Sequence, residues 1–287
     1  MKQPQLVLCA LTMLIAVSES SARTIYVNNL AGSNRLNGLA EARESGSVGP
    51  VRSLQKAVRL ANFGDTIVIA NTGVPYYESL HLTGGRHSGN ATVPFRVLGN
   101  GATLSGRWSV PPECWKGEGQ NLWSIEPPHK GHYLLFRDGQ KVEQADIYGD
   151  RYAINGMEVG KFAVNAGRVF YRTDKGEDPR LMNFAMPQRT TGISLYGVRN
   201  VLIQDLNVKH FRIDGVNAHD LCRNVLLRKV SSEQNARSGM TVAGSSRVIL
   251  RNCNVKENGA TSLRIQERGE ADVQDCNLDT EPALIRE

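Results

Sequence analysis

The chain has 287 residues and a formal net charge of +6. This length allows one large core, or one core with a smaller excursion. The positive charge favours acidic partners, and no segment after the first 22 residues approaches the length of a membrane-spanning helix. The cysteines show no CxxC or Cys/His spacing of the kind that predicts a zinc site.

The N-terminus has the features of a secretory signal. Residues 6–17 (LVLCALTMLIAV) are apolar, follow Lys2 and precede the small residues Ser20, Ser21 and Ala22. We therefore predict a signal peptide over residues 1–22, too short for a membrane span. The mature chain, from about Arg23, is expected to be secreted, periplasmic or at the cell surface, without stable membrane insertion.

Residues 23–110 predict an N-terminal cap and the first coils of a repeating β structure. TIYVNN (24–29) alternates as a strand does, and a Gly-, Asn- and Ser-rich loop follows it. Ser53 is a candidate N-cap for the amphipathic helix LQKAVRLANF, with Gly64 as its stop. Repeat folds need a cap over their open apolar end, and this helix can supply one.

Residues 107–190 do not follow the repeat pattern of the rest of the chain, and they contain all three tryptophans. Short alternating runs such as HYLLFRDGQKVEQA (132–145) predict a small β-rich insertion, which we assign to residues 111–190. The tryptophans have two interpretations, a core for the insertion or a platform on which sugar rings stack. Under the second, Trp115 and Trp123 are candidate substrate-binding residues.

Residues 191–287 contain one pattern four times. VLIQDLNV (201–208), VLLRKVSS (225–232), VILRNCNV (248–255) and ADVQDCNL (271–278) follow one another at offsets of 24, 23 and 23 residues. Gly192, Gly215 and Gly239 stand ahead of a second apolar register in the first three units. Apolar residues recur every second position, which is the periodicity of strands.

Stacking such units about 4.8 Å apart pairs each backbone with its neighbours and aligns like residues in interior columns. The expected fold is an all-β, right-handed parallel β-helix with an N-terminal capping α-helix and a β-rich insertion. A leucine-rich repeat shares the period, but these units lack its dense leucine spacing. Ala283-Leu284-Ile285 aligns as the start of a fifth coil, so we expect an open C-terminal end through which the protein could associate with itself or a partner.

The segments TIYVNN (24–29), SLQKAVRLANFGDTIVIANTGVPYYESLHL (53–82) and FRVLGNGATLSG (95–106) resemble the opening of secreted right-handed β-helix proteins of the pectin-lyase-like superfamily. The resemblance covers most of 24–110 and again 191–281. It implies a secreted protein that acts on, or lies among, polysaccharides, often acidic ones. Many members are lyases, hydrolases or epimerases, and calcium is a cofactor that the resemblance implies for some of them.

One further segment, NGATSLRI (258–265), resembles a motif "NG.ET.RIG" of an alginate- and chondroitin-degrading lyase family in that superfamily. Ser262 stands here in the place of the motif's Glu. The family's catalytic Lys and Arg and its calcium-binding carboxylates lie largely on later coils, which this sequence does not contain.

The densest polar group near the point where the insertion rejoins contains His210, Arg212, Asp214, His219 and Asp220. β-Elimination of a uronate needs a cation at the carboxylate and a base at the adjacent carbon, whereas hydrolysis needs two carboxylates. The candidate catalytic residues are Lys209, His210, Arg212 and His219. The alternative is that these side chains are hydrogen-bonded turn residues without a catalytic role.

Two outward columns carry charge. Lys209, Glu233, Lys256 and Asp279 alternate in sign, as a structural salt-bridge ladder does. Arg228 and Arg251 are predicted neighbours that would repel unless an anion offsets them, so they are candidate substrate-binding residues. Cys253 and Cys276 fall in one interior column, and we expect a stacked pair of thiols rather than a bridge.

Three hypotheses about function follow. The first is a polysaccharide lyase-like protein acting on acidic polysaccharide. The second is a non-catalytic glycan-binding or structural surface protein, and the third is a truncated, inactive paralogue. The expected partner in the first two is acidic polysaccharide rather than nucleic acid. The residues themselves do not predict a cofactor, and calcium is implied only by the resemblance.

Overall fold

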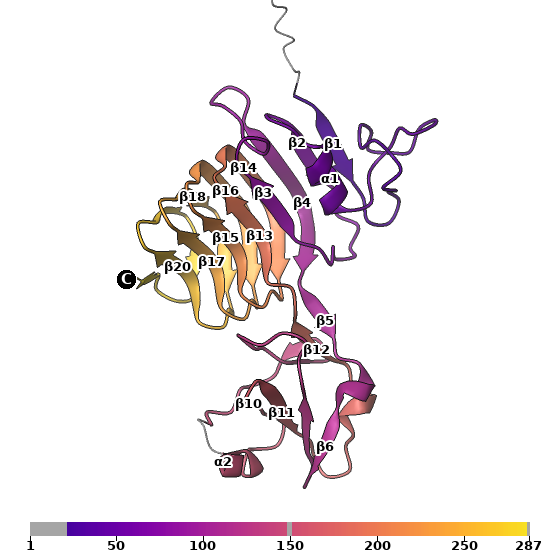
Figure 1. The fold of residues 1–287 in the computed structure, drawn as a ribbon, viewed down its shortest axis with the longest axis vertical. Helices are drawn as coiled ribbons and strands as arrows, with labels where there is room; N and C mark the ends of the chain where they lie inside the picture. The colour runs from indigo at the N-terminus through magenta and orange to yellow at the C-terminus, as the bar shows by residue number, and fades with distance from the viewer. Residues whose placement is uncertain (1–21, 148–150, 286–287) are drawn as a thin grey trace, which may run out of the picture.

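The computed structural model describes residues 22–147 and 151–285. The predicted signal peptide, with Cys9, lies outside these residues except for Ala22. Figure 1 shows a stack of coils with a smaller unit attached at one end of the strands through β5 and β12. In the described residues no helix has the length and apolar character needed to cross a membrane.

Two parallel sheets form the coils, and they confirm the predicted right-handed parallel β-helix. Sheet A contains β1 (Thr24–Val27), β2 (Thr66–Ile69), β4 (Phe95–Ser105), β14 (Arg199–Lys209), β16 (Arg223–Glu233), β18 (Arg247–Arg251), β19 (Asn254–Lys256), β21 (Glu270–Gln274) and β22 (Asn277–Leu278). Sheet B contains β3 (Leu80–Thr83), β13 (Thr191–Tyr196), β15 (Asp214–His219), β17 (Ser238–Ala243), β20 (Thr261–Gln266) and β23 (Ala283–Ile285).

The register of sheet A is the one that the repeat predicts. Val201 pairs with Val225, Val225 with Val248, and Val248 with Ala271. These side chains point into one core that runs through all the coils. Cys253 and Cys276 are free thiols stacked in the same interior, and the Cys253 N–H lies 3.3 Å from the Cys276 Sγ.

Positive φ angles mark the bends of the coils, and two of these bends recur from coil to coil. The long path along sheet A bends at Asp205, Lys229, Asn252 and Asp275, whose φ values are 56°, 52°, 53° and 51°. A second bend at His210, Gln234 and Glu257 begins the segments 210–213, 234–237 and 257–260, which we call the A-to-B turns. These two bends, with the turn that returns from sheet B to sheet A, give each coil three sides, and sheet B forms one of them.

A column of glycines allows the A-to-B turns to fold close to sheet B. A Cβ atom on Gly215 would lie 2.0 Å from the Ser232 Oγ, and one on Gly239 would lie 2.1 Å from a methyl carbon of Val255. Gly192 is in the same column. No larger residue fits there without displacing the neighbouring turn.

The N-terminal cap helix is α1 (Leu54–Leu60). The Ser53 side chain accepts from the Lys56 N–H, as predicted, and the Glu78 carboxylate accepts from the N–H groups of Leu54 and Gln55. The helix packs against β1 and β3, where it covers the first coil. It ends earlier than the sequence predicts, because Ala61 is already extended at ψ 143°.

The insertion, residues 107–187, forms a second unit that we call the excursion. One of its sheets contains β5 (Arg107–Ser109), β12 (Phe184–Pro187), β8 (Phe136–Arg137) and β9 (Gln140–Lys141). The other contains β6 (Lys116–Gly119), β7 (Leu122–Ile125), β11 (Arg168–Arg172) and β10 (Phe162–Asn165). Its short helices are α2 (Arg151–Asn155) and the 3₁₀ turns η1 (Pro112–Cys114) and η2 (Pro179–Leu181).

The excursion interrupts an A-to-B turn. Ser105 pairs with Lys209 before the turn, and Thr191 pairs with Asp214 after it. Gly106 and Gln188 therefore stand where His210 and Phe211 stand one coil later, and the Gln188 N–H donates to the Gly106 carbonyl at 2.9 Å. The whole excursion is an insertion between two residues of one turn.

Candidate functional site

Part of the excursion folds back over the A-to-B turns. We call residues 129–134 the strap. The Arg212 Nη1 donates to the Lys130 carbonyl at 2.7 Å, and Leu134 and Phe136 form a buried cluster with Ala236 of the coils. The strap is thereby fixed beside the outer face of sheet B.

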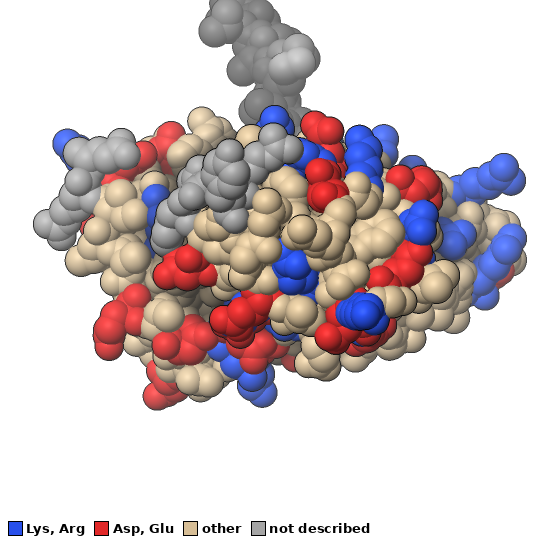
Figure 2. Space-filling model, turned by 90° about the horizontal axis from the view of Figure 1, so that it is seen from below, with Lys and Arg blue, Asp and Glu red and all other residues tan. Residues whose placement is uncertain are grey.

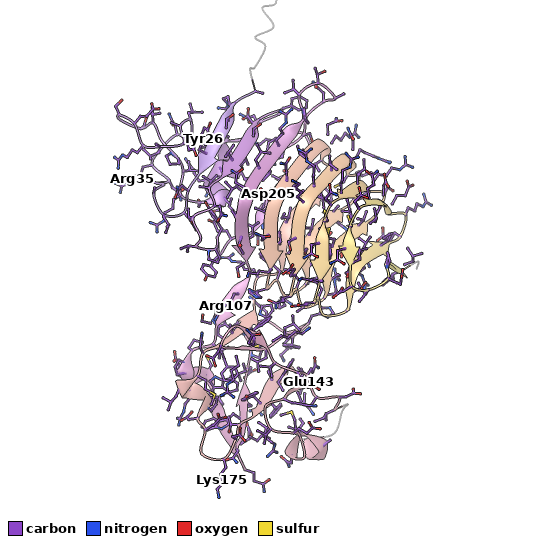
Figure 3. All side chains as sticks on the ribbon, turned by 180° about the vertical axis from the view of Figure 1, so that it is seen from behind. Tyr26, Arg35, Arg107, Glu143, Lys175 and Asp205 are labelled. Carbon is purple, nitrogen blue, oxygen red and sulfur yellow. The ribbon has the colours of Figure 1, made fainter. Side chains whose placement is uncertain are left out.

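Two hollows join beside the strap and form a groove along the starting edge of sheet B. Their volumes are about 610 and 560 Å³, and both are lined by Ser79, His81 and Arg189. The remaining lining residues are Tyr77, Arg107, His129, Gln188, Thr190, Thr191 and Ser194 in the first hollow, and Gln55, Val58, Arg59 and Glu78 in the second. Arg107 lies at the narrow junction between the coils and the excursion (Figure 3).

Arginines follow this edge from coil to coil, and we call Arg189, Arg212, Arg237 and Arg264 the arginine row. The Arg212 N–H donates to the Arg189 carbonyl at 2.8 Å, so these two lie on adjacent turns. Arg237 is on the next turn, and Arg264 is on the outer face of β20, paired with Thr241. Like charges on neighbouring strands repel one another unless an anion offsets them.

The carboxylate of Asp214 is fully buried within the row. It accepts from the Arg237 Nε at 3.0 Å and Nη2 at 2.6 Å, and from the Ser238 Oγ at 2.8 Å. The Asn217 amide adds a fourth bond at 2.8 Å. This carboxylate is therefore a fixed anchor for Arg237, and the charges of the other three arginines remain available.

Several polar atoms at this edge are buried but unpaired. Among the described residues, the Arg212 Nε, the Arg264 Nε and the Asn217 Oδ1 have no hydrogen-bond partner. Buried polar groups without partners are costly, typically about 1–3 kcal/mol each.

Two histidines border the row. Partial burial, and then the charge of Arg189, lower the pKa of His81. Partial burial, and then the charge of Arg237, lower the pKa of His132 on the strap. Both imidazoles are consequently neutral at pH 7, and a neutral imidazole can accept a proton from a substrate.

The structure separates the four predicted catalytic residues. Arg212 belongs to the row, but Lys209 lies on sheet A opposite Glu233, on another side of the coil. His219 is exposed at the far end of β15, about 16 Å from Asp214 at 3.3 Å per residue, and it lies beside Tyr196. The charge ladder that includes Lys209 has its ion pair between Glu233 and Lys256, at 4.0 Å.

His210 is a hydrogen-bonded turn residue, the alternative that the sequence left open, and it also packs against the excursion. Its Nε2 lies 3.0 Å from the Gln234 Oε1, its Nδ1 lies 3.3 Å from the Ser105 Oγ, and Phe136 meets its ring edge-on. Burial lowers the pKa of His210 to about 4. Neither nitrogen is free for a substrate, so we remove His210 from the candidate catalytic residues.

Arg228 and Arg251 are neighbours on sheet A, as predicted, but they bond in opposite directions. Arg228 donates to Gln204 on the preceding coil, and the Arg251 Nε donates to Gln274 on the following coil at 2.8 Å. The glutamine oxygens therefore relieve the repulsion for which we invoked an anion. These two arginines also lie on a different side of the coils from the groove.

Of the two interpretations of the tryptophans, the structure agrees with a core for the insertion rather than a sugar-stacking platform. Trp115 is only 5% exposed and packs against Phe184 and Tyr171, at ring-centre distances of 4.9 and 6.2 Å. Trp123 is half-buried, and the guanidinium of Arg180 lies 5.1 Å above its ring. Trp115 thus belongs to the core of the excursion, because no face of its ring is free for a sugar.

The calcium that the resemblance implies does not fit the residues present. In the described ranges, no group of three or more His, Cys, Asp or Glu side chains is placed to hold a metal ion. The carboxylate of Asp214 already accepts bonds from Arg237, Ser238 and Asn217. We therefore derive no chemistry through a metal.

Most residues of the groove and of the arginine row with its bordering histidines were missed from the sequence. Arg189, Arg237, Arg264, His81 and His132 lie on different coils or on the excursion, so no single motif contains them. One pattern in the sequence could have pointed to the arginines, because an arginine stands two or three residues before each of Gly192, Gly215 and Gly239.

From below, the far face of the excursion shows acidic and basic side chains interspersed, with no comparable row (Figure 2).

Comparison with known proteins supports the fold. The family described as "Right handed beta helix region" matches residues 140–280. A solved structure titled "Glycoside hydrolase" superimposes with a TM-score of 0.58 at 12% identity over 85% of this chain. A second, titled "The complex structure of XylC with xylose", has a TM-score of 0.56 at 10% identity over 91% of this chain.

The chain spans 67% of the length of the first of these structures and 60% of the second. A search of curated proteins found no match. Identities this low establish the fold alone. The chain is therefore a right-handed parallel β-helix protein with the pectin-lyase-like fold.

Proposed function

We propose that this protein acts outside the cell as a polysaccharide lyase-like protein that holds an acidic polysaccharide along the arginine row. The observation that carries the proposal is the row itself, with positive side chains from four successive coils beside one anchored carboxylate. Adjacent coils are about 4.8 Å apart. Arginines at this spacing can contact successive carboxylates of a polymer whose acidic groups also recur along a line.

The residues beside the row suit β-elimination. An arginine at the uronate carboxylate makes the adjacent C–H more acidic, and a neutral histidine can take that proton. The bond from the next carbon to the glycosidic oxygen then breaks, a C=C bond forms, and the leaving oxygen takes up a proton. His81 lies in the groove with Arg189 and is the candidate base.

Hydrolysis is the second candidate, because one of the similar structures is titled a glycoside hydrolase. It requires two carboxyl groups about 5–10 Å apart that are free to exchange protons. Glu78 lines the groove and Asp214 lies buried within the row, but the first accepts from the N-terminus of α1 and the second is bonded to Arg237. The geometry therefore favours β-elimination.

The test is a screen of the signal-free protein against pectate, alginate, chondroitin sulfate and heparin, with and without calcium. Ultraviolet absorbance reports an unsaturated uronate, and a reducing-end assay reports hydrolysis. We expect unsaturated product from at least one glycan, and its loss in His81→Gln with binding retained. Binding without product from folded protein would replace the enzyme by a glycan-binding protein, and absence of binding would overturn the proposal.

Arginine variants test the binding site separately. Arg189→Ala removes a charge-assisted contact worth about 1.5–3 kcal/mol, so the affinity should fall roughly tenfold to hundredfold. The matched control is Arg228→Ala, because that arginine is on another side of the coils and bonds Gln204. Equal effects of the two substitutions would place the glycan elsewhere.

A further inference from the structure

A third hollow lies on the other side of the strap from the groove. Its volume is about 760 Å³, and it lies between the excursion and two A-to-B turns. Its lining residues are Gly131, His132, Tyr133, Leu134, Lys141, Val142, Glu143, Gln144, Phe162, Val164, Ala236, Gly259 and Ala260. Figure 3 shows Glu143 on the side of the excursion that faces the later coils.

The floor of this hollow continues the column of Arg212 on the later coils, with small residues in place of the arginine. The Ala236 N–H donates to the Phe211 carbonyl and the Gly259 N–H to the Asn235 carbonyl, so Arg212, Ala236 and Gly259 follow one another on successive turns. Gly259 is required by the backbone, because a Cβ there would lie 2.0 Å from the Ala236 carbonyl oxygen. Ala236 and the exposed Ala260 leave the space beside it open.

The walls and rim differ in charge from the groove. Phe162, Val164 and Val142 provide apolar surface. At the rim, Lys141 is positive and Glu143 is negative, and Glu143 is also paired with Lys161 at 2.8 Å. An apolar wall with a few polar groups and no excess of one charge is the lining that an uncharged, amphipathic ring requires.

The strap connects the two sites. Arg212 reaches the Lys130 carbonyl from the groove side, and the next strap residues line the third hollow. Arg237 and Arg264 act on the pKa of His132, which places this strap residue within their field. Ala236 directly precedes Arg237, and the Ala260 N–H donates to the Arg237 carbonyl, so the hollow lies beside the later part of the row and a polymer on the row passes it.

We propose that the third hollow binds an uncharged sugar residue of the same polysaccharide whose uronates lie along the arginine row. The ligand is then a heteropolymer in which acidic and uncharged residues both occur, rather than a polyuronate. This inference rests on the proposed function, since the row must hold the acidic residues.

The experiment compares two probes by isothermal titration calorimetry. Polygalacturonate contains only uronates, whereas hyaluronan alternates glucuronate with an uncharged N-acetylated sugar. Ala260→Trp fills the hollow, and Gln144→Ala removes a rim amide without adding bulk. The control is Ala91→Trp, an equally drastic change at an exposed loop residue remote from the hollow.

We expect the wild-type protein to bind hyaluronan more tightly, and Ala260→Trp and Gln144→Ala to lower that affinity at least fivefold while leaving polygalacturonate binding unchanged. Arg189→Ala should weaken both probes. If the hollow variants affect both probes alike or neither, the inference fails and the function of the row stands. If the wild-type protein binds no acidic glycan, the proposed function fails as well.

Discussion

At the scale of single residues, His210 shows how burial turns a candidate catalytic group into a structural one. The ring is neutral because burial lowers the pKa of His210 to about 4, whereas an unfolded histidine titrates near 6.5. The folded state resists protonation between these values. The stabilisation is therefore fully present above about pH 6.5 and declines as the pH falls to about 4.

We expect this effect to amount to about 3 kcal/mol in the free energy of unfolding. The comparison is between the wild-type protein and His210→Gln, by urea unfolding at about pH 7.5 and about pH 4.5. The wild-type protein should lose more stability on acidification than the variant. A difference between the two proteins that does not change with pH would contradict this assignment.

Asp214 gives a second prediction at this scale. Its side chain is 0% exposed while that of its partner Arg237 is 21% exposed, so Asp214→Asn leaves a largely buried guanidinium without its counter-ion. We expect a loss of about 3 kcal/mol in urea unfolding. The control is Glu270→Gln, whose ion pair with Arg247 is about 60% exposed on both sides and should cost less than about 1 kcal/mol. Similar losses in the two variants would refute the role of burial.

At the scale of elements, the glycine column sets how closely each A-to-B turn packs on sheet B. Gly215→Ala brings a methyl group to 2.0 Å from the Ser232 Oγ, in a region where Ser232 and Asn235 are fully buried. We expect a loss of at least about 2 kcal/mol in urea unfolding. Gly117→Ala is the control, because the nearest atom to its new methyl group is an ordinary 3.8 Å away. An equal, small effect at both positions would show that the turns can move apart.

The coils could be predicted from the sequence because each residue's neighbour is its own equivalent one repeat away. The offset of one repeat between Val201 and Val225 predicts that they pair, and the offset of one repeat between Arg228 and Arg251 predicts their pairing in the same way. The candidate site could not be predicted in the same way. Its groove depends on the strap, and the packing of Phe136 on His210 joins residues that no repeat relates.

At the scale of the whole molecule, the excursion is a removable insertion. Without residues 107–187, Gly106-Gln188-Arg189-Thr190 has the length of the A-to-B turn His210-Phe211-Arg212-Ile213. We expect the shortened protein to keep the far-ultraviolet circular dichroism of a β-helix and to unfold cooperatively. It should lose its preference for hyaluronan, because the third hollow has no wall. Failure to fold, in a protein that is otherwise soluble, would mean that the coils depend on the excursion.

The place of the insertion also bears on the order in which the chain folds. β4 and β14 are adjacent in sheet A, but about 80 more residues separate them than separate the strands of the later coils. Closing that loop as a disordered chain, instead of a turn of a few residues, would cost about 3 kcal/mol in entropy. An excursion that folds first, with β5 already paired to β12, brings Gly106 and Gln188 together and removes most of that cost. We therefore expect the pairing of β4 with β14 to follow the folding of the excursion, and the later coils, with their local contacts, to add quickly once it has occurred.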